Sequence, residues 1–190
     1  MPKAIDHARD SILSATRSLV AREGYESLNM RTIACASGIG TGTVYNYFGA
    51  KDEIVFALMT EDWNRTLESM DSALDAKLDS GFVSAEARAG CLESIFTPLK
   101  EFIHTYKGIW IILAGSPPGE KSPSVRHYDK ALFMEELAQR IQRVWAPAGG
   151  NRDDFTVSFV CRSLSTYAQE GDFDFKELAK ILGRLMETKE

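Results

Sequence analysis

The chain has 190 residues, of which 44% are hydrophobic and 26% are charged, and its formal net charge is −5. This composition is typical of a folded globular protein and excludes an extended disordered chain. No run approaches the roughly 20 apolar residues that a membrane helix requires, and the polar first ten residues do not resemble a secretory signal. We therefore expect a soluble, cytoplasmic protein.

The charge is unevenly distributed along the chain. Residues 1–51 carry six Lys/Arg and four Asp/Glu, a net charge of +2, whereas the remaining residues carry −7. A mildly basic segment joined to an acidic one is the distribution expected when only the basic segment meets a polyanion such as DNA. By itself this asymmetry is weak evidence.

The first 50 residues predict three short helices. Gly24 follows the first run of helically spaced apolar residues and is suited to end it, and Asn29 is a suitable N-cap for the second helix. Residues 38–40 contain two glycines and interrupt the helical pattern. The predicted helices span residues 6–23, 30–37 and 41–48.

The rest of the chain also predicts helices, with no alternating strand pattern and no internal repeat. A long helix over residues 51–78 is indicated by apolar residues at steps of three and four: Val55, Met59, Trp63, Leu67, Met70, Leu74 and Leu78. Pro98 should kink the helix that follows. The further predicted helices span residues 84–106, 109–114, 125–145, 151–170 and 173–187. The fold class is therefore all-α, with about nine helices.

Residues 29–48 have the layout of a helix-turn-helix, in which two short helices flank a three-residue turn. Ala34 is small where the second helix must cross the first closely, and Gly38 can adopt the positive φ that the turn requires. Apolar residues that would anchor this unit to its own core are Ile33, Ile39 and Val44. We therefore predict a helix-turn-helix domain over residues 1–50, called the head below, and a larger helical domain over residues 51–190.

The second helix of the motif would present polar, almost uncharged side chains to the outside. These are Thr41, Thr43, Tyr45, Asn46 and Tyr47. Such a helix fits the major groove of DNA, where an asparagine can pair with adenine and tyrosine can reach a phosphate. Lys51, at the start of the long helix, would add a charge and free backbone N–H groups, both of which favour a phosphate.

The segment from Arg31 to Ile54 resembles the DNA-binding signature of TetR-type transcriptional regulators. The shared pattern is an Ile-Ala pair, a glycine, a Gly-Thr-hydrophobe-Tyr stretch, a Tyr-Phe pair and then a lysine. The resemblance extends over residues 9–60, and beyond them only to the number and length of the helices. It implies a homodimer with a DNA-reading head and a helical body that usually binds a small effector.

Matched position by position, the resemblance implies a set of DNA-binding residues. Thr43 and Tyr45 match phosphate-contacting positions, and Asn46 and Tyr47 match positions that face the groove. The full set is Arg31, Thr41, Gly42, Thr43, Tyr45, Asn46, Tyr47 and Lys51. The sequence departs from the family at residues 49–50, where a polar cap is usual, and this departure predicts a looser start for the long helix.

Two further sets of residues are expected in the body. Aromatic and methionine side chains at helical spacing are typical of a core, but the resemblance implies that some line an effector pocket: Met59, Trp63, Phe96, Phe102, Tyr106, Trp110, Phe133 and Met134. The last two helices carry apolar faces wide enough for half of a four-helix dimer interface. The predicted interface residues are Phe155, Phe159, Leu164, Leu178, Ile181 and Leu185.

No catalytic or metal-binding set is visible. The three histidines, His7, His104 and His127, have neither the mutual spacing nor the cysteine partners of a metal site. We expect Cys35 to be a small residue of the motif helix, and Cys91 and Cys161 to be buried. The glycine-rich residues 38–42 are not a dinucleotide loop, because that fingerprint requires a glycine at position 43, where Thr43 stands, and a preceding strand. We therefore expect no enzyme activity, no cofactor and no metal.

The function that these patterns favour is a DNA-binding transcriptional repressor. It would bind a palindromic operator as a homodimer and be released by a small apolar or amphipathic effector. Two alternatives stay open at this point. One is a helix-turn-helix regulator with a solid body, controlled by a protein partner or by nothing; the other is a helical enzyme in which the motif is a decoy.

Overall fold

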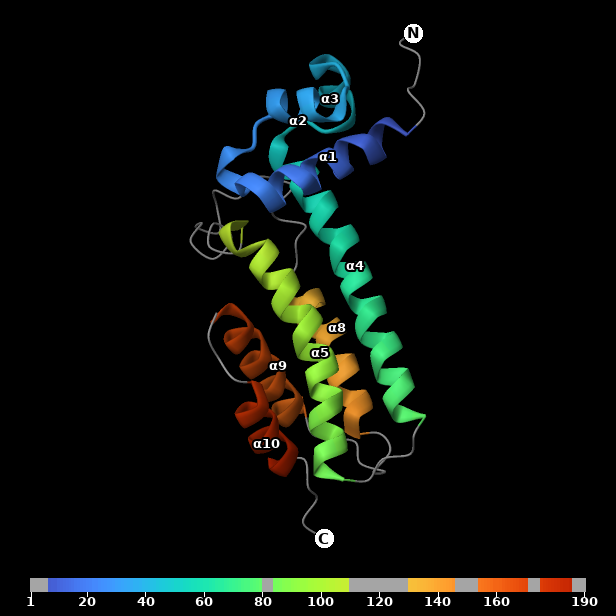
Figure 1. Cartoon of the computed structure of the whole chain (residues 1–190), viewed down its shortest axis with the longest axis vertical. Helices are drawn as coiled ribbons and strands as arrows, with labels where there is room; N and C mark the ends of the chain where they lie inside the picture. Colours follow the sequence, from blue (N-terminus) through green and yellow to red (C-terminus); the bar gives the residue numbers. More distant parts are fainter. Residues whose placement is uncertain (1–6, 80–83, 110–129, 146–153, 171–174, 186–190) are drawn as a thin grey trace. The chain divides into compact units, whose positions relative to one another are not determined.

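The computed structural model describes residues 7–79, 84–109, 130–145, 154–170 and 175–185 (Figure 1). These residues form eight α-helices and one short 3-10 helix, and no strand occurs among them. The elements are α1 (Ala8–Glu23), η1 (Tyr25–Ser27), α2 (Met30–Ser37), α3 (Thr41–Tyr47), α4 (Lys51–Leu78), α5 (Ala85–Thr105), α8 (Lys130–Trp145), α9 (Asp154–Gln169) and α10 (Phe175–Leu185). The all-α prediction is confirmed.

The chain divides into two compact units, and helices α4 and α5 each contribute to both. One unit holds residues 1–63 and 105–128, and the other holds residues 64–104 and 129–190. The predicted helix over residues 109–114, apart from its first residue, lies outside the described residues, as does the start of the one predicted over 125–145.

The local signals that predict the head also explain its geometry. The Asn29 side chain accepts hydrogen bonds from the backbone N–H groups of Arg31 and Thr32, at 3.1 and 2.9 Å, while the Thr32 hydroxyl accepts one from Asn29 N–H. This reciprocal capping box satisfies donors that the first turn of a helix otherwise leaves free. Gly24 and Gly38 adopt φ of 76° and 68° and end α1 and α2, as predicted.

The first unit is built around α1 and the helix-turn-helix. Helix α1 packs on α2, and α2 packs on α3. The apolar residues that fill the space between these helices include Ile12, Leu13, Ile33, Ile39 and Val44, all of which are buried. The motif therefore has its own core, which fixes the direction in which α3 faces outward.

The second unit combines the later part of α4 with α5, α8, α9 and α10. Phe96 of α5 stacks on Phe175 of α10 at 4.2 Å between ring centroids, and Phe102 of α5 stacks on Phe133 of α8 at 6.1 Å. Helix α8 packs on α9. Polar contacts add to this core, because Asp71 of α4 accepts hydrogen bonds of 2.7 Å from both Arg140 and Arg143 of α8.

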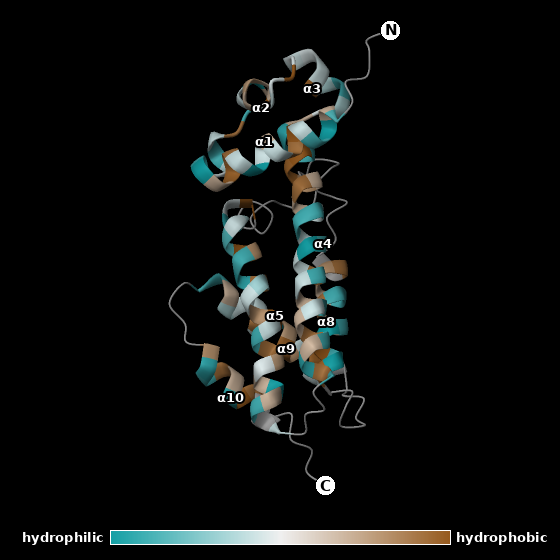
Figure 2. Ribbon diagram, turned by 45° about the vertical axis from the view of Figure 1, so that its right-hand side comes forward, coloured by the Kyte–Doolittle hydropathy of each residue, from teal (hydrophilic) through white to brown (hydrophobic). Residues whose placement is uncertain are grey.

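Hydropathy along the helices accounts for this packing. Six residues of the predicted α4 stripe are buried, namely Val55, Met59, Trp63, Leu67, Met70 and Leu74. Hydrophilic residues interrupt the apolar ones along α4 and α10 (Figure 2). Among the helices described, none is both long enough and apolar enough to cross a membrane.

Candidate nucleic-acid interface

Helix α3 has one buried side and one exposed side. Val44 is fully buried, whereas Thr41 and Asn46 are exposed and Tyr45 and Tyr47 keep 53% and 40% of their surface accessible. Phe48, directly after the helix, is buried. The predicted exposure of Tyr45 is confirmed, so α3 presents hydroxyl and amide groups away from the protein.

Three of the predicted DNA-binding residues meet in one surface hollow, which we call the Lys51 hollow. Its volume is about 670 Å³, and it is lined by Asn29, Met30, Arg31, Tyr45, Gly49, Ala50 and Lys51. Arg31 comes from α2, Tyr45 from α3 and Lys51 from the first turn of α4. Two cations, a phenol hydroxyl and a helix N-terminus at one place are the chemistry that binds a phosphate group. The other predicted residues (Thr41, Gly42, Thr43, Asn46 and Tyr47) lie on α3 outside this hollow.

The Lys51 side chain is held by an aromatic ring that the sequence did not single out. Its Nζ lies 4.5 Å from the ring centroid of Tyr25, a cation–π distance. The Tyr25 hydroxyl in turn donates a 2.6 Å hydrogen bond to the Asp52 carboxylate. Burial raises the pKa of Tyr25, and the hydrogen bond to Asp52 raises it further, so the phenol stays protonated and continues to donate. The ring therefore restricts where the ammonium group can lie.

The start of α4 differs from the sequence prediction. The Glu53 carboxylate accepts a 2.7 Å hydrogen bond from the backbone N–H of Gly49. A carboxylate at the third helical position that reaches back to the preceding segment satisfies a free donor and matches the positive end of the helix dipole. The looser start expected from the missing polar cap at residues 49–50 is therefore not observed. The acidic first turn of the helix was the signal that could have predicted this contact.

The predicted effector residues are mostly part of the protein's own packing. Phe96, Phe102 and Phe133 stack on aromatic partners, and the Tyr106 hydroxyl donates a 2.6 Å hydrogen bond to Asp62. The remaining members Met59 and Trp63 are buried, and Met134 is half-buried. Trp110 lies outside the described residues. That any of these residues contacts an effector stays a prediction.

The predicted dimer residues separate into two groups. Phe155, Phe159 and Ile181 are 80%, 48% and 57% exposed, which is unusual for large apolar side chains grouped on two helices. Leu164 and Leu178 are buried within the single chain, so we assign them to its core, where they add no exposed area to an interface. Leu185 lies in α10, but its side chain is outside the described residues.

The cysteines lie as the sequence predicted, and no metal site emerges from the described part of the chain. Cys91 and Cys161 are buried and Cys35 is exposed, all as free thiols. Burial raises the pKa of the Cys161 thiol to about 12, and it also raises that of Cys91. Both thiols are therefore poor nucleophiles at neutral pH. No group of three or more His, Cys, Asp or Glu side chains is gathered for a metal ion among the residues described.

Comparisons with known proteins agree with this geometry. Residues 12–58 match the family described as "Bacterial regulatory proteins, tetR family". The chain is 30% identical over 76 residues to the HTH-type transcriptional repressor KstR of Mycobacterium tuberculosis, covering 40% of this chain and 31% of KstR. It is 31% identical over 146 residues to an uncharacterised HTH-type transcriptional regulator of Haemophilus influenzae, covering 75% of this chain and 65% of that protein. The chain thus spans less than two thirds of either relative.

The similarity in fold covers more of the chain than the match to the family model does. The structure of RolR in complex with the ligand resorcinol superposes with a TM-score of 0.56 at 20% identity, covering 95% of this chain and 87% of RolR. At this identity the likeness concerns the fold alone. Residues 12–58, which hold the helix-turn-helix, therefore match the tetR family of bacterial regulatory proteins by sequence, and the described helices share the fold of RolR.

Proposed function

We propose that this protein is a cytoplasmic, homodimeric transcriptional repressor that binds an inverted-repeat operator and is released by a small molecule, and that it has no enzyme activity. One observation carries the proposal. The exposed polar side of α3 lies in the same compact unit as the Lys51 hollow, where Arg31, Tyr45 and Lys51 meet. Base-reading groups and phosphate-binding groups on one small domain are what a DNA-binding head requires.

The finer parts of the proposal draw on separate observations. Repression is supported by the name of KstR, a transcriptional repressor, and control by a small molecule is supported by RolR, solved with resorcinol. Dimerisation is supported by the exposed Phe155, Phe159 and Ile181 on α9 and α10. A twofold dimer would carry two copies of α3, as an inverted repeat requires.

The deciding experiment is selection of the preferred sequence from random duplex DNA by the full chain. We expect an inverted repeat whose half-sites are one helical turn or a whole number of turns apart, about 34–36 Å per turn. Recovery of unrelated sequences, or of single half-sites bound by a monomer, would reject the proposal. A screen of small molecules by thermal shift then tests the effector, since a true effector must raise the melting temperature and weaken operator binding.

Lys51→Ala should weaken binding to every DNA sequence by a similar factor. The substitution removes one phosphate contact from each head and no base contact, so the slope of log affinity against log salt should fall by about one unit per half-site. Fluorescence anisotropy titrations at four salt concentrations, on the selected operator and on a scrambled duplex, measure both quantities. The control is Arg65→Ala, which removes a positive charge from α4 outside the first unit and should leave the slope unchanged. A loss confined to the operator would assign Lys51 to base reading instead.

A further inference from the structure

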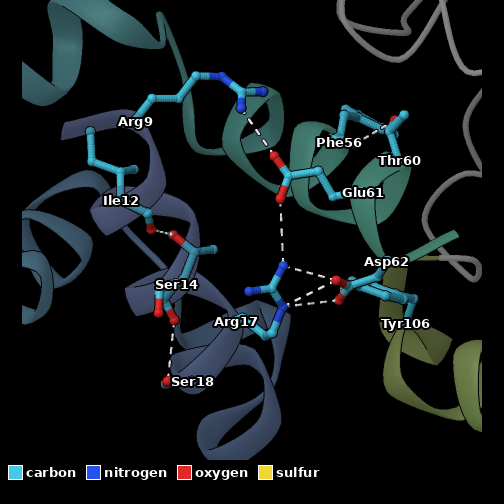
Figure 3. Close-up of polar contacts among 11 residues, drawn as sticks. Arg9, Ile12, Ser14, Arg17, Ser18, Phe56, Thr60, Glu61, Asp62 and Tyr106 are labelled. Atoms are coloured by element: carbon cyan, nitrogen blue, oxygen red, sulfur yellow. Dashed lines mark hydrogen bonds and ion pairs between the residues drawn. The ribbon is translucent and has the colours of Figure 1, made fainter. Parts of the chain in front are cut away.

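A cluster of polar side chains joins α1, α4 and the residue that follows α5. Figure 3 shows Arg17 of α1 beside Glu61 and Asp62 of α4, with the Tyr106 side chain meeting Asp62. Arg17 donates from Nη2 and Nε to Asp62 Oδ1 at 2.9 and 3.1 Å, and Tyr106 donates from its hydroxyl to Asp62 Oδ2 at 2.6 Å. One carboxylate therefore accepts from two segments of the chain, and we call these three residues the Asp62 cluster.

The Asp62 cluster is shielded from water. Tyr106 is 1% exposed, and the side chains of Asp62 and Arg17 are 17% and 33% exposed. Burial lowers the pKa of Arg17, but the hydrogen bond and the charge of Asp62 more than offset this, so the pKa of the guanidinium is raised and it stays charged. Charge-assisted hydrogen bonds of this kind are short and directional, so they constrain geometry as well as adding stability. The parallel pair of Arg9 and Glu61, at 3.0 Å, is more exposed and should contribute less.

All three residues of the Asp62 cluster belong to the first unit, and two of them lie close in sequence to the points at which the chain leaves that unit. Along α4 the division falls between residues 63 and 64, one residue after Asp62, and at the end of α5 it falls between residues 104 and 105, one residue before Tyr106. Any displacement of α4 or α5 therefore reaches the Asp62 cluster through the covalent backbone. Because α1 packs on α2, and α2 packs on α3, the cluster also bears on the orientation of the reading helix.

We infer that Asp62 and Tyr106 are positioning residues, which hold the head in the arrangement that binds both half-sites of the operator. This inference rests on the proposed function, under which the protein without effector binds its operator, so that the contacts within the protein favour the binding arrangement. Neither residue reads a base. Each acts through Arg17 on the orientation of α1, and thereby on the spacing between the two heads of a dimer. That spacing sets how much affinity is gained when both half-sites are bound at once.

The test compares two duplexes of equal length bound by the full chain. One carries the inverted repeat selected by the wild type, and the other carries the same sequence with one half-site scrambled. Tyr106→Phe, which removes only the hydroxyl oxygen, should lower affinity for the inverted repeat about tenfold or more, the effect of one hydrogen bond to a charged acceptor. Affinity for the single half-site should stay within about twofold. Asp62→Asn removes the charge that both Arg17 and Tyr106 contact. It should lower the ratio of inverted-repeat affinity to half-site affinity by the same factor or more.

The matched control is Asp71→Asn, a second carboxylate on α4 that pairs with two arginines but belongs to the other unit. It should leave the ratio of the two affinities unchanged. Circular dichroism melting shows which variants are folded. If Asp62→Asn does not fold, Tyr106→Phe alone still tests the inference. An unchanged ratio in folded Tyr106→Phe, or equal losses on both duplexes, overturns the inference while leaving the proposed function intact. A wild type that does not prefer the inverted repeat overturns both.

Discussion

Replacing Phe155 and Phe159 together with aspartate should leave the protein monomeric and lower its affinity for the inverted repeat by at least about 100-fold. The two rings lie four residues apart on α9, hence on one face of the helix, and are 80% and 48% exposed. Fully burying a phenylalanine contributes about 1.5–3 kcal/mol, and a twofold interface counts each ring twice. Four carboxylates in their place would add the cost of burying charge.

Analytical ultracentrifugation measures the assembly, and circular dichroism melting checks that the variant is folded. Because both side chains are exposed in the protomer, their replacement should change its intrinsic stability little. Leu132→Asp is the matched control: Leu132 is 58% exposed on α8 but belongs to no predicted interface. A double variant that still sediments as a dimer, or a control that becomes monomeric, would show that the interface lies elsewhere.

The head could be predicted closely from the sequence because its signals are local. Gly24, Asn29 and Gly38 each act on the backbone within a few residues, and the structure ends or starts helices at all three. The exposed side of α3 follows from the burial of Val44 alone, since seven residues of helix have only one inner face. Sequence patterns of this kind predict where a helix begins and ends and which of its faces is buried.

Contacts between distant segments could not be predicted in this way. The hydrogen bonds of Asp62 join it to residues 45 and 44 positions away, and nothing in the spacing of charges selects these partners over others. Lys51 was predicted, but its aromatic partner Tyr25 was not, because their proximity depends on how the start of α4 lies relative to η1. Which residues of the body serve as core and which as surface is likewise a property of the packed unit.

The apolar faces of α9 and α10 illustrate the same limit. Their periodicity predicts that Phe159, Leu164, Leu178 and Ile181 face other apolar groups, but not whether those groups belong to the same protomer. The structure buries Leu164 and Leu178 within the single chain and leaves Phe159 and Ile181 exposed. Each helix therefore has an inner apolar stripe and an outer one. Only the outer one is available to a second copy.

Asn46→Ala should abolish much of the preference for the selected operator and leave general DNA affinity nearly unchanged. Asn46 is exposed on α3, where its amide can donate to and accept from one base edge, an arrangement that discriminates by about 1–3 kcal/mol. A dimer uses the residue twice, so affinity for the operator should fall at least about 30-fold, by the conversion of 1.4 kcal/mol per factor of ten. Alanine is the stronger helix former, so the loss should not come from unfolding of α3.

Titrations of the operator and of a scrambled duplex of equal length, at one salt concentration, separate the two contributions. The matched control is Asn64→Ala, the same chemical change at an exposed position of α4 that belongs to the second unit, and it should alter neither affinity. Repeating the random-sequence selection with Asn46→Ala should return sites with relaxed preference at one position in each half-site. Equal losses on the operator and the scrambled duplex would instead mean that Asn46 contacts the backbone, and base reading would then have to come from Thr41, Tyr47 or the glycine-flanked start of α3.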